Sequence, residues 1–150
     1  MKKQALRIFT TVAFFAVLAA APAYAQSGSR IVGRATIPFD FVIKNEKAAS
    51  GQYTVERINS SSGTTVLLLR SADGRGIEMF MPMTVQAGKS VDRGKLVFHR
   101  YGDQYFLYQI WQSGDQLGHE LPKSRRERVL RQEVARAMSQ HQKVTIALNR

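Results

Sequence analysis

Apolar and polar residues alternate along much of the chain. From Ala35 to Ile43 every second position is apolar, and this spacing predicts a half-buried strand. Pro38 lies inside the segment and cannot donate a backbone hydrogen bond, so the strand is expected at a sheet edge or paired only beyond the proline. Residues 45–51 then predict a turn.

Two more strands follow. The segments 53–58 and 65–70 are rich in apolar and β-branched residues, and turn-forming residues follow them at 59–63 and 72–76. Four apolar residues in a row, beginning at Val66, predict that the second of these strands is buried on both faces.

Residues 77–85 alternate again. Met79, Met81 and Met83 share one side of this predicted strand, and Pro82 is a second obstacle to pairing. Methionine is flexible and polarizable, so the row can serve as an adaptable surface for an apolar ligand or a partner. We favour the simpler interpretation that these side chains fill the core. Thioethers suit Cu(I), but no histidine lies beside them, and a copper site is not predicted.

The strongest local pattern predicts a β-hairpin across residues 95–112, where aromatic and β-branched segments flank Gly102 and Asp103. A two-residue loop sets the register and places Tyr101 opposite Gln104. One face then carries Leu96, Phe98, Arg100, Tyr105, Leu107 and Trp111, and the other carries Val97, His99, Tyr101, Phe106, Tyr108 and Ile110. Both faces are rich in aromatic residues, so the hairpin is expected at the centre of the fold. One face is expected to be buried and the other to be partly covered or offered to a ligand, and the sequence does not decide which.

A helix is predicted from Arg125 to about Gln140. Ser124 and Glu127 have the S-x-x-E spacing in which each side chain satisfies a backbone donor of the first turn. At helical spacing the apolar stripe is Leu130, Val134, Ala137 and Met138, and the opposite side holds Arg125, Arg128, Gln132 and Arg136. The helix is therefore expected to pack on the sheet and to expose arginines.

Residues 143–149 alternate once more and predict a closing strand. Together these elements predict a mainly β fold of about seven antiparallel strands, with one C-terminal amphipathic helix before the last strand. The pattern fits both a β-sandwich and a partly open small β-barrel.

The start of the chain has the features of an export signal. Basic residues precede an apolar run at 8–20, and the small residues Ala23 and Ala25 suit cleavage after residue 25. The run is shorter than the ~20 residues that cross a bilayer, so no transmembrane segment is expected after cleavage. We expect a flexible stretch at 26–33, a single β-rich domain at 34–150, and a destination in the periplasm or outside the cell.

Composition narrows the chemistry. The chain has no cysteine, which excludes disulfides, thiolate catalysis and thiolate metal sites. Its formal net charge is +11 at pH 7, which favours an anionic partner, although we favour the simpler interpretation that the basic surface serves solubility. After export the anions within reach are an envelope polymer, a lipid head group or a protein, and nucleic acid is not expected.

Two binding surfaces are candidates. Arginine grips phosphate or carboxylate groups with a planar fork, so Arg125, Arg128 and Arg136 are the expected contacts for an anion or partner, unless they form an ordinary solvated face. A small barrel would instead hold an apolar ligand, as an alternative function. Its candidate lining is Phe98, Leu107, Trp111, Met79, Met81 and Met83.

Catalytic patterns are weak. His99, His119 and His141 have none of the spacings of zinc ligands. His119 and Glu120 can in principle activate Ser124 or a water, but the context of a nucleophilic serine is missing. We therefore expect a non-enzymatic binding or structural module without metal or cofactor, and a hydrolase is the less favoured hypothesis.

Several segments together resemble a group of known proteins. They are the run from Lys95 to Leu107, Ile110-Trp111, the run from Gly118 to Glu127, Ile37-Pro38-Phe39-Asp40-Phe41 and Gly51-Gln52-Tyr53-Thr54-Val55. These segments resemble small exported bacterial proteins that are usually labelled hypothetical. The resemblance covers most of the chain after the export signal. It implies export and a β-rich domain, and it implies no activity, ligand or catalytic residue.

Overall fold

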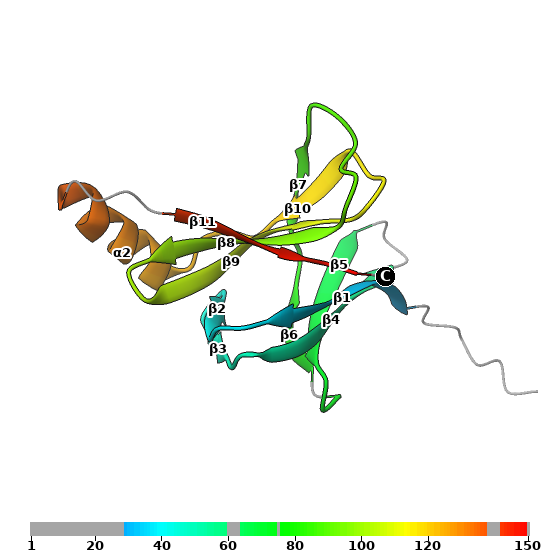
Figure 1. The fold of residues 1–150 in the computed structure, drawn as a ribbon, viewed down its shortest axis with the longest axis horizontal. Coiled ribbons are helices and arrows are strands. Elements are labelled where there is room, and N and C mark those ends of the chain that lie inside the picture. Colours follow the sequence, from blue (N-terminus) through cyan, green and yellow to red (C-terminus); the bar gives the residue numbers. More distant parts are fainter. Residues whose placement is uncertain (1–28, 60–63, 75, 138–141, 150) are drawn as a thin grey trace, which may run out of the picture.

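The computed structural model describes residues 29–59, 64–74, 76–137 and 142–149. These residues form two β-sheets and one helix (Figure 1). The first sheet contains, in spatial order, β1 (Ser29–Ile37), β4 (Gly51–Asn59), β5 (Thr65–Ser71) and β6 (Gly76–Phe80). The second contains β11 (Gln142–Ala147), β8 (Lys95–Tyr101), β9 (Gln104–Trp111), β10 (Leu117–Glu120) and β7 (Met83–Gln86). The helix α2 (Arg125–Arg136) lies between β10 and β11 in the chain.

Two short strands complete the second sheet. The strand β2 (Phe41–Ile43) pairs in parallel with β9 and antiparallel with β3 (Glu46–Ala48). The fold is therefore mainly β and sandwich-like, with one C-terminal helix before the last strand, as predicted. Neither sheet closes on itself within the described residues.

The two sheets are joined along one side. Arg34 N donates to Asn149 O at 2.6 Å, and Asn149 N donates to Arg34 O at 2.8 Å, which links β1 to the chain end that follows β11. Apolar side chains from both sheets fill the space between them, because each strand turns alternate residues inward. The fully buried ones include Ile37, Ile43, Val55, Leu67, Leu69, Leu96, Phe98 and Ile110.

Each of the two prolines singled out in the sequence lies where the chain leaves one sheet and enters the other. The predicted strand at 35–43 is two strands, because β1 ends before Pro38 and β2 begins after it. The alternation survives the break, and β1 lies at the edge of its sheet, as expected. The predicted strand at 77–85 is likewise divided at Pro82 into β6 and β7.

The methionine prediction is wrong. Met79, Met81 and Met83 are 55%, 68% and 55% exposed, whereas Phe80 is buried. The alternation correctly placed the three methionines on one side of the segment, but that side faces solvent and not the core. The segment runs along the edges of both sheets, because β6 and β7 are edge strands. Burial of β5 on both faces is confirmed, since Leu67, Leu68 and Leu69 are all buried.

The predicted hairpin is confirmed, with Tyr101 opposite Gln104 and the register continuing to Phe98 and Leu107. Beyond that pair the register shifts, because Tyr108 is an additional residue on β9. The predicted faces are therefore wrong at the end of β9. Ile110 joins Leu96, Phe98 and Leu107 in the main core, while Trp111 lies outside that cluster.

Other differences are small. Two short strands, β3 and β10, were not expected, and β3 lies inside the predicted turn at 45–51. Together with the two divided strands they raise the number from about seven to eleven in the described residues. The helix ends at Arg136 rather than near residue 140, and β11 closes the fold as predicted.

Some expectations fall outside the described residues. They are the export signal at 1–25, most of the turn at 59–63, Met138 and His141. Among the residues that the structure describes, no helix has the length and apolar character needed to span a membrane.

Gly118 provides a test of this packing. A Cβ at residue 118 would lie 2.6 Å from the nearest ring atom of Trp111, so Gly118→Ala should lower the free energy of unfolding by about 1–3 kcal/mol through overpacking. Gly88→Ala is the matched control, because a Cβ at residue 88 would meet no atom within 4 Å. Urea unfolding of both variants measures the difference, and equal stability would contradict this packing.

Candidate functional site

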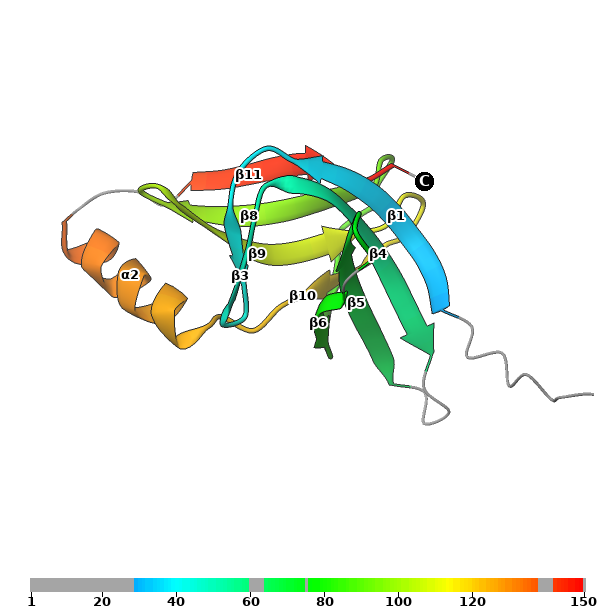
Figure 2. The same cartoon turned by 90° about the horizontal axis from the view of Figure 1, so that it is seen from below.

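The helix α2 is the element with the strongest concentration of charge. Its twelve residues, RRERVLRQEVAR, contain five arginines and two glutamates. Figure 1 and Figure 2 show it at one end of the molecule, beyond the hairpin of β8 and β9. The way in which the helix is attached determines which of its side chains remain available.

The start of the helix is fixed from two sides. Ser124 is the N-cap, and its Oγ accepts a hydrogen bond of 3.0 Å from the backbone N–H of Glu127. Just before it, Leu121 is buried and its N–H donates to Tyr108 O at 2.8 Å. The predicted capping role of Ser124 is confirmed, and the segment leading into α2 is held on β9.

Glu127 has a different role from the one predicted. Its carboxylate does not complete a reciprocal cap, because Oε1 lies 2.8 Å from Nδ1 of His99 on β8. Both side chains are about 5% exposed. Tyr101 Oη donates to the same Oε1 at 3.5 Å. Burial, and next the negative charge of Glu127, raise the pKa of Tyr101 to about 12.

His99, on β8, is the residue of the sheet that contacts Glu127. Its ring stacks on Tyr108 with centroids 3.9 Å apart. His99 is therefore a hydrogen-bonded residue of the sheet. The outer face of the hairpin is therefore buried as well as the inner one, since α2 covers His99 and Tyr101 while the other sheet covers Phe98.

The apolar stripe of α2 packs as predicted for two of its residues. Leu130 and Val134 lie against a small cluster of Val42, Tyr101 and Phe106. Ala137, which follows the helix, is exposed. The stripe therefore anchors α2 along one side only, and the remaining sides carry the charged residues.

The predicted arginines are exposed. Arg125, Arg128 and Arg136 all lie on the solvent side of α2, and Arg126 and Arg131 are exposed with them. Among the described residues, none of the ion pairs involves these five side chains. Because Glu127 is buried against His99, Glu133 is the one carboxylate that α2 exposes.

A two-part hollow adjoins the start of α2. One part, of about 430 Å³, is lined by residues of β2, β3 and the β8–β9 turn together with Arg126. The other, of about 470 Å³, lies along the helix beside Arg125, Val129 and Glu133. Gln104 lines both parts, and its buried Oε1 has no hydrogen-bond partner among the described residues. The surface beside Arg125 and Arg126 is therefore concave.

The apolar residues predicted as a ligand lining do not come together. Phe98 and Leu107 are packed in the main core, and Trp111 is buried outside it. The three methionines lie on the outside, at the crossing from β6 to β7.

The residues of the hydrolase hypothesis are separated too. His119 and Glu120 are neighbours on β10, so their side chains point to opposite faces. Glu120 accepts a hydrogen bond of 2.8 Å from Gln109, whereas His119 lies 3.3 Å from Arg57. Ser124 is occupied as the helix cap. Across the described residues, no group of three or more His, Asp or Glu is arranged to hold a metal ion.

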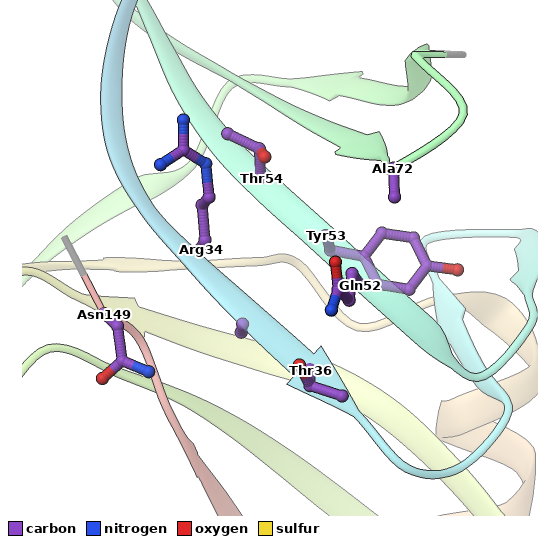
Figure 3. Close-up of a pocket in the computed structure, with 8 residues that line it drawn as sticks. Arg34, Thr36, Gln52, Tyr53, Thr54, Ala72 and Asn149 are labelled. Carbon is purple, nitrogen blue, oxygen red and sulfur yellow. The ribbon is translucent and has the colours of Figure 1, made fainter.

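Another hollow, of about 470 Å³, lies over β1 and β4 (Figure 3). Of the described residues that line it, Arg34 is the charged one, and Thr36, Gln52 and Thr54 accompany it. These are outward-facing positions of neighbouring strands. The arrangement is that of a polar outer sheet face, so it ranks below α2 as a site.

No family model matches the chain, and no curated protein or solved structure is significantly similar to it. The resemblance to small exported proteins therefore stays an expectation, and the site rests on its own geometry.

The link between His99 and Glu127 can be tested by removing the carboxylate. Glu127→Ala leaves the buried His99 and Tyr101 without this acceptor, so the free energy of unfolding should fall by about 2 kcal/mol or more. Glu133→Ala, an exposed glutamate of the same helix, should change it by less than about 0.5 kcal/mol. Urea unfolding provides the comparison, and equal losses would show that the link does not stabilise the fold.

Proposed function

We propose that this chain is an exported, non-enzymatic binding module, and that α2 contacts an anionic polymer of the cell envelope. The observation that carries the proposal is the arginine face of α2. Five exposed guanidinium groups lie on a twelve-residue helix and lack carboxylate partners among the described residues. Such groups suit phosphate or carboxylate groups repeated along a chain.

The attachment of the helix supports this proposal. The Ser124 cap, the His99–Glu127 hydrogen bond and the Leu130–Val134 stripe fix α2 before any partner arrives. Less conformational freedom is then lost on binding, which favours affinity. The two-part hollow beside Arg125 and Arg126 adds a concave surface, whose lining also includes Asp40, Asp103 and Glu133.

A polymer fits this helix better than a membrane surface. Interfacial helices insert aromatic or large apolar side chains beside their basic residues. On α2, Val129 is the one large apolar side chain that is strongly exposed, at 48%. Export, which the sequence pattern of the first 25 residues favours, would bring the chain to anionic envelope polymers.

The carrier of an apolar ligand has less support. Phe98 is fully buried and Leu107 is 3% exposed within the packed core, so these two candidate lining residues already have protein neighbours.

Salt-dependent binding to heparin, used as a representative polyanion, tests the arginine face. Arg125→Gln/Arg128→Gln/Arg136→Gln should weaken binding roughly 3- to 150-fold at 0.1 M salt, because each of the three exposed charge pairs contributes roughly 0.2–1 kcal/mol. Arg34→Gln/Lys89→Gln/Arg93→Gln is the matched control, since it removes the same charge from exposed positions outside α2.

Equal weakening in both triple variants would contradict a specific role for α2 and would indicate a response to net charge alone. Tighter binding to anionic lipid vesicles than to heparin, lost in the α2 variant, would replace the polymer by a membrane surface.

Export is tested by expressing the chain with its own first 25 residues. Mass spectrometry of the exported protein should give the mass of residues 26–150, as expected for cleavage after Ala25. An intact chain that stays in the cytoplasm would contradict export.

A further inference from the structure

Three methionines form a row on the surface where the chain crosses from β6 to β7 (Figure 1). Met79 lies on β6, Met83 begins β7, and Met81 lies between the two strands. Each of the three side chains is more than half exposed, whereas Phe80 is buried on the other side of the segment. The thioethers of this methionine row are therefore accessible from solvent on one side of a single segment.

Packing in the core does not explain the row. Among the described residues, the buried apolar side chains include no methionine, so the core is built without this residue type. Edge strands usually place charged residues where they are exposed, because an apolar edge favours association with other chains. Here three alternate positions along two edge strands carry thioethers instead. A role for the sulfur atoms themselves accounts for methionine at all three.

The spacing allows the three sulfurs to share one ion. Residues two apart on an extended chain lie about 6.4–6.8 Å apart and point to the same side. Met81 precedes Pro82, and a following proline favours extended backbone. Methionine is unbranched and has three rotatable bonds, so each thioether can turn toward its neighbour. Met81 is the middle ligand, within this spacing of both Met79 and Met83.

The charges beside the row favour a cation. Met83 lies directly opposite Glu120 on β10, and residues paired in this way have side chains on the same face. At the other end, the ammonium group of Lys44 donates to Glu78 Oε1 at 2.8 Å and to Met79 O at 3.0 Å. The positive charge of Lys44 is thus matched by Glu78. One end of the row lies beside a carboxylate, and the other lies beside a paired lysine.

The donor atoms select the kind of ion. Soft thioethers favour Cu(I), whereas Zn²⁺ is bound by thiolate, imidazole and carboxylate groups. The chain has no cysteine, so thioethers are its only soft sulfur ligands. The sequence spacing alone fitted a buried strand face equally well. The exposure of all three side chains removes that interpretation.

We propose that Met79, Met81 and Met83 bind one Cu(I) ion through their thioether sulfurs. Each neutral thioether coordinates through a lone pair, so binding releases no proton and changes no oxidation state. Because the side chains are exposed, the ion reaches them without any movement of the core. The site is separate from α2, and it does not depend on the polymer-binding role proposed for that helix.

NMR of the protein labelled with ¹³C at its methionine methyl groups tests the site. Ag(I), a redox-stable substitute for Cu(I), should shift the Met79, Met81 and Met83 signals together and saturate them at about one equivalent. Met138, which lies outside the row, is the internal control, and its signal should not move. Zn²⁺ should leave the three signals unchanged, because thioethers are poor ligands for it.

The affinity for Cu(I) itself is measured without oxygen, by competition with the chelator bicinchoninate. Met81→Leu should weaken binding about ten-fold or more, because the middle one of three soft ligands is lost. Leucine has nearly the volume of methionine and residue 81 is exposed, so the fold should be retained. Met138→Leu is the matched control and should bind Cu(I) as the wild type does.

Three results would overturn the proposal. They are row signals that do not saturate with Ag(I), row signals that move no more than that of Met138, and equal Cu(I) affinity in Met81→Leu and the wild type. The NMR titration uses the wild-type protein, so it does not depend on the folding of either variant.

Discussion

The hydrogen bond between His99 and Glu127 is the interaction on which the candidate surface depends. It joins β8 to α2 across 28 residues of sequence at 2.8 Å, in a place where both side chains are buried. A buried carboxylate must be hydrogen-bonded, and here one histidine and one tyrosine meet that need. The same contact withdraws a negative charge from the surface of α2. The His99–Glu127 hydrogen bond therefore both attaches the helix to the sheet and leaves its outer side basic.

The two-sheet architecture depends on where the chain crosses between layers. Pro38 and Pro82 each separate a strand of the first sheet from a strand of the second. Proline suits these crossings because it cannot continue a ladder of hydrogen bonds. The second crossing exposes three methionines along the edges of both sheets. It also brings Thr84 on β7 beside β10, where His119 and Arg57 meet.

Local patterns predicted much of this fold. Alternation located the long strands, the Gly102-Asp103 loop set the hairpin register near the turn, and Ser124 marked the start of α2. The rest depends on tertiary contacts. The extra residue Tyr108 shifts the end of β9, and the direction in which the methionines face depends on which sheet edge they follow. The arginine face was predictable from helical spacing. The His99–Glu127 and Arg57–His119 contacts were not, because each joins strands or helices whose register the sequence does not reveal.

Polymer binding by α2 is tested most directly by an NMR titration of the isotope-labelled protein, residues 26–150, with a heparin oligosaccharide. We expect backbone amide shifts to concentrate on α2, residues 125–136, and on the adjoining hollow around Gln104. These changes should be saturable and should be reversed by salt. Shifts spread evenly over exposed basic residues, or concentrated on β1 and β4 with α2 unchanged, would contradict polymer binding by α2.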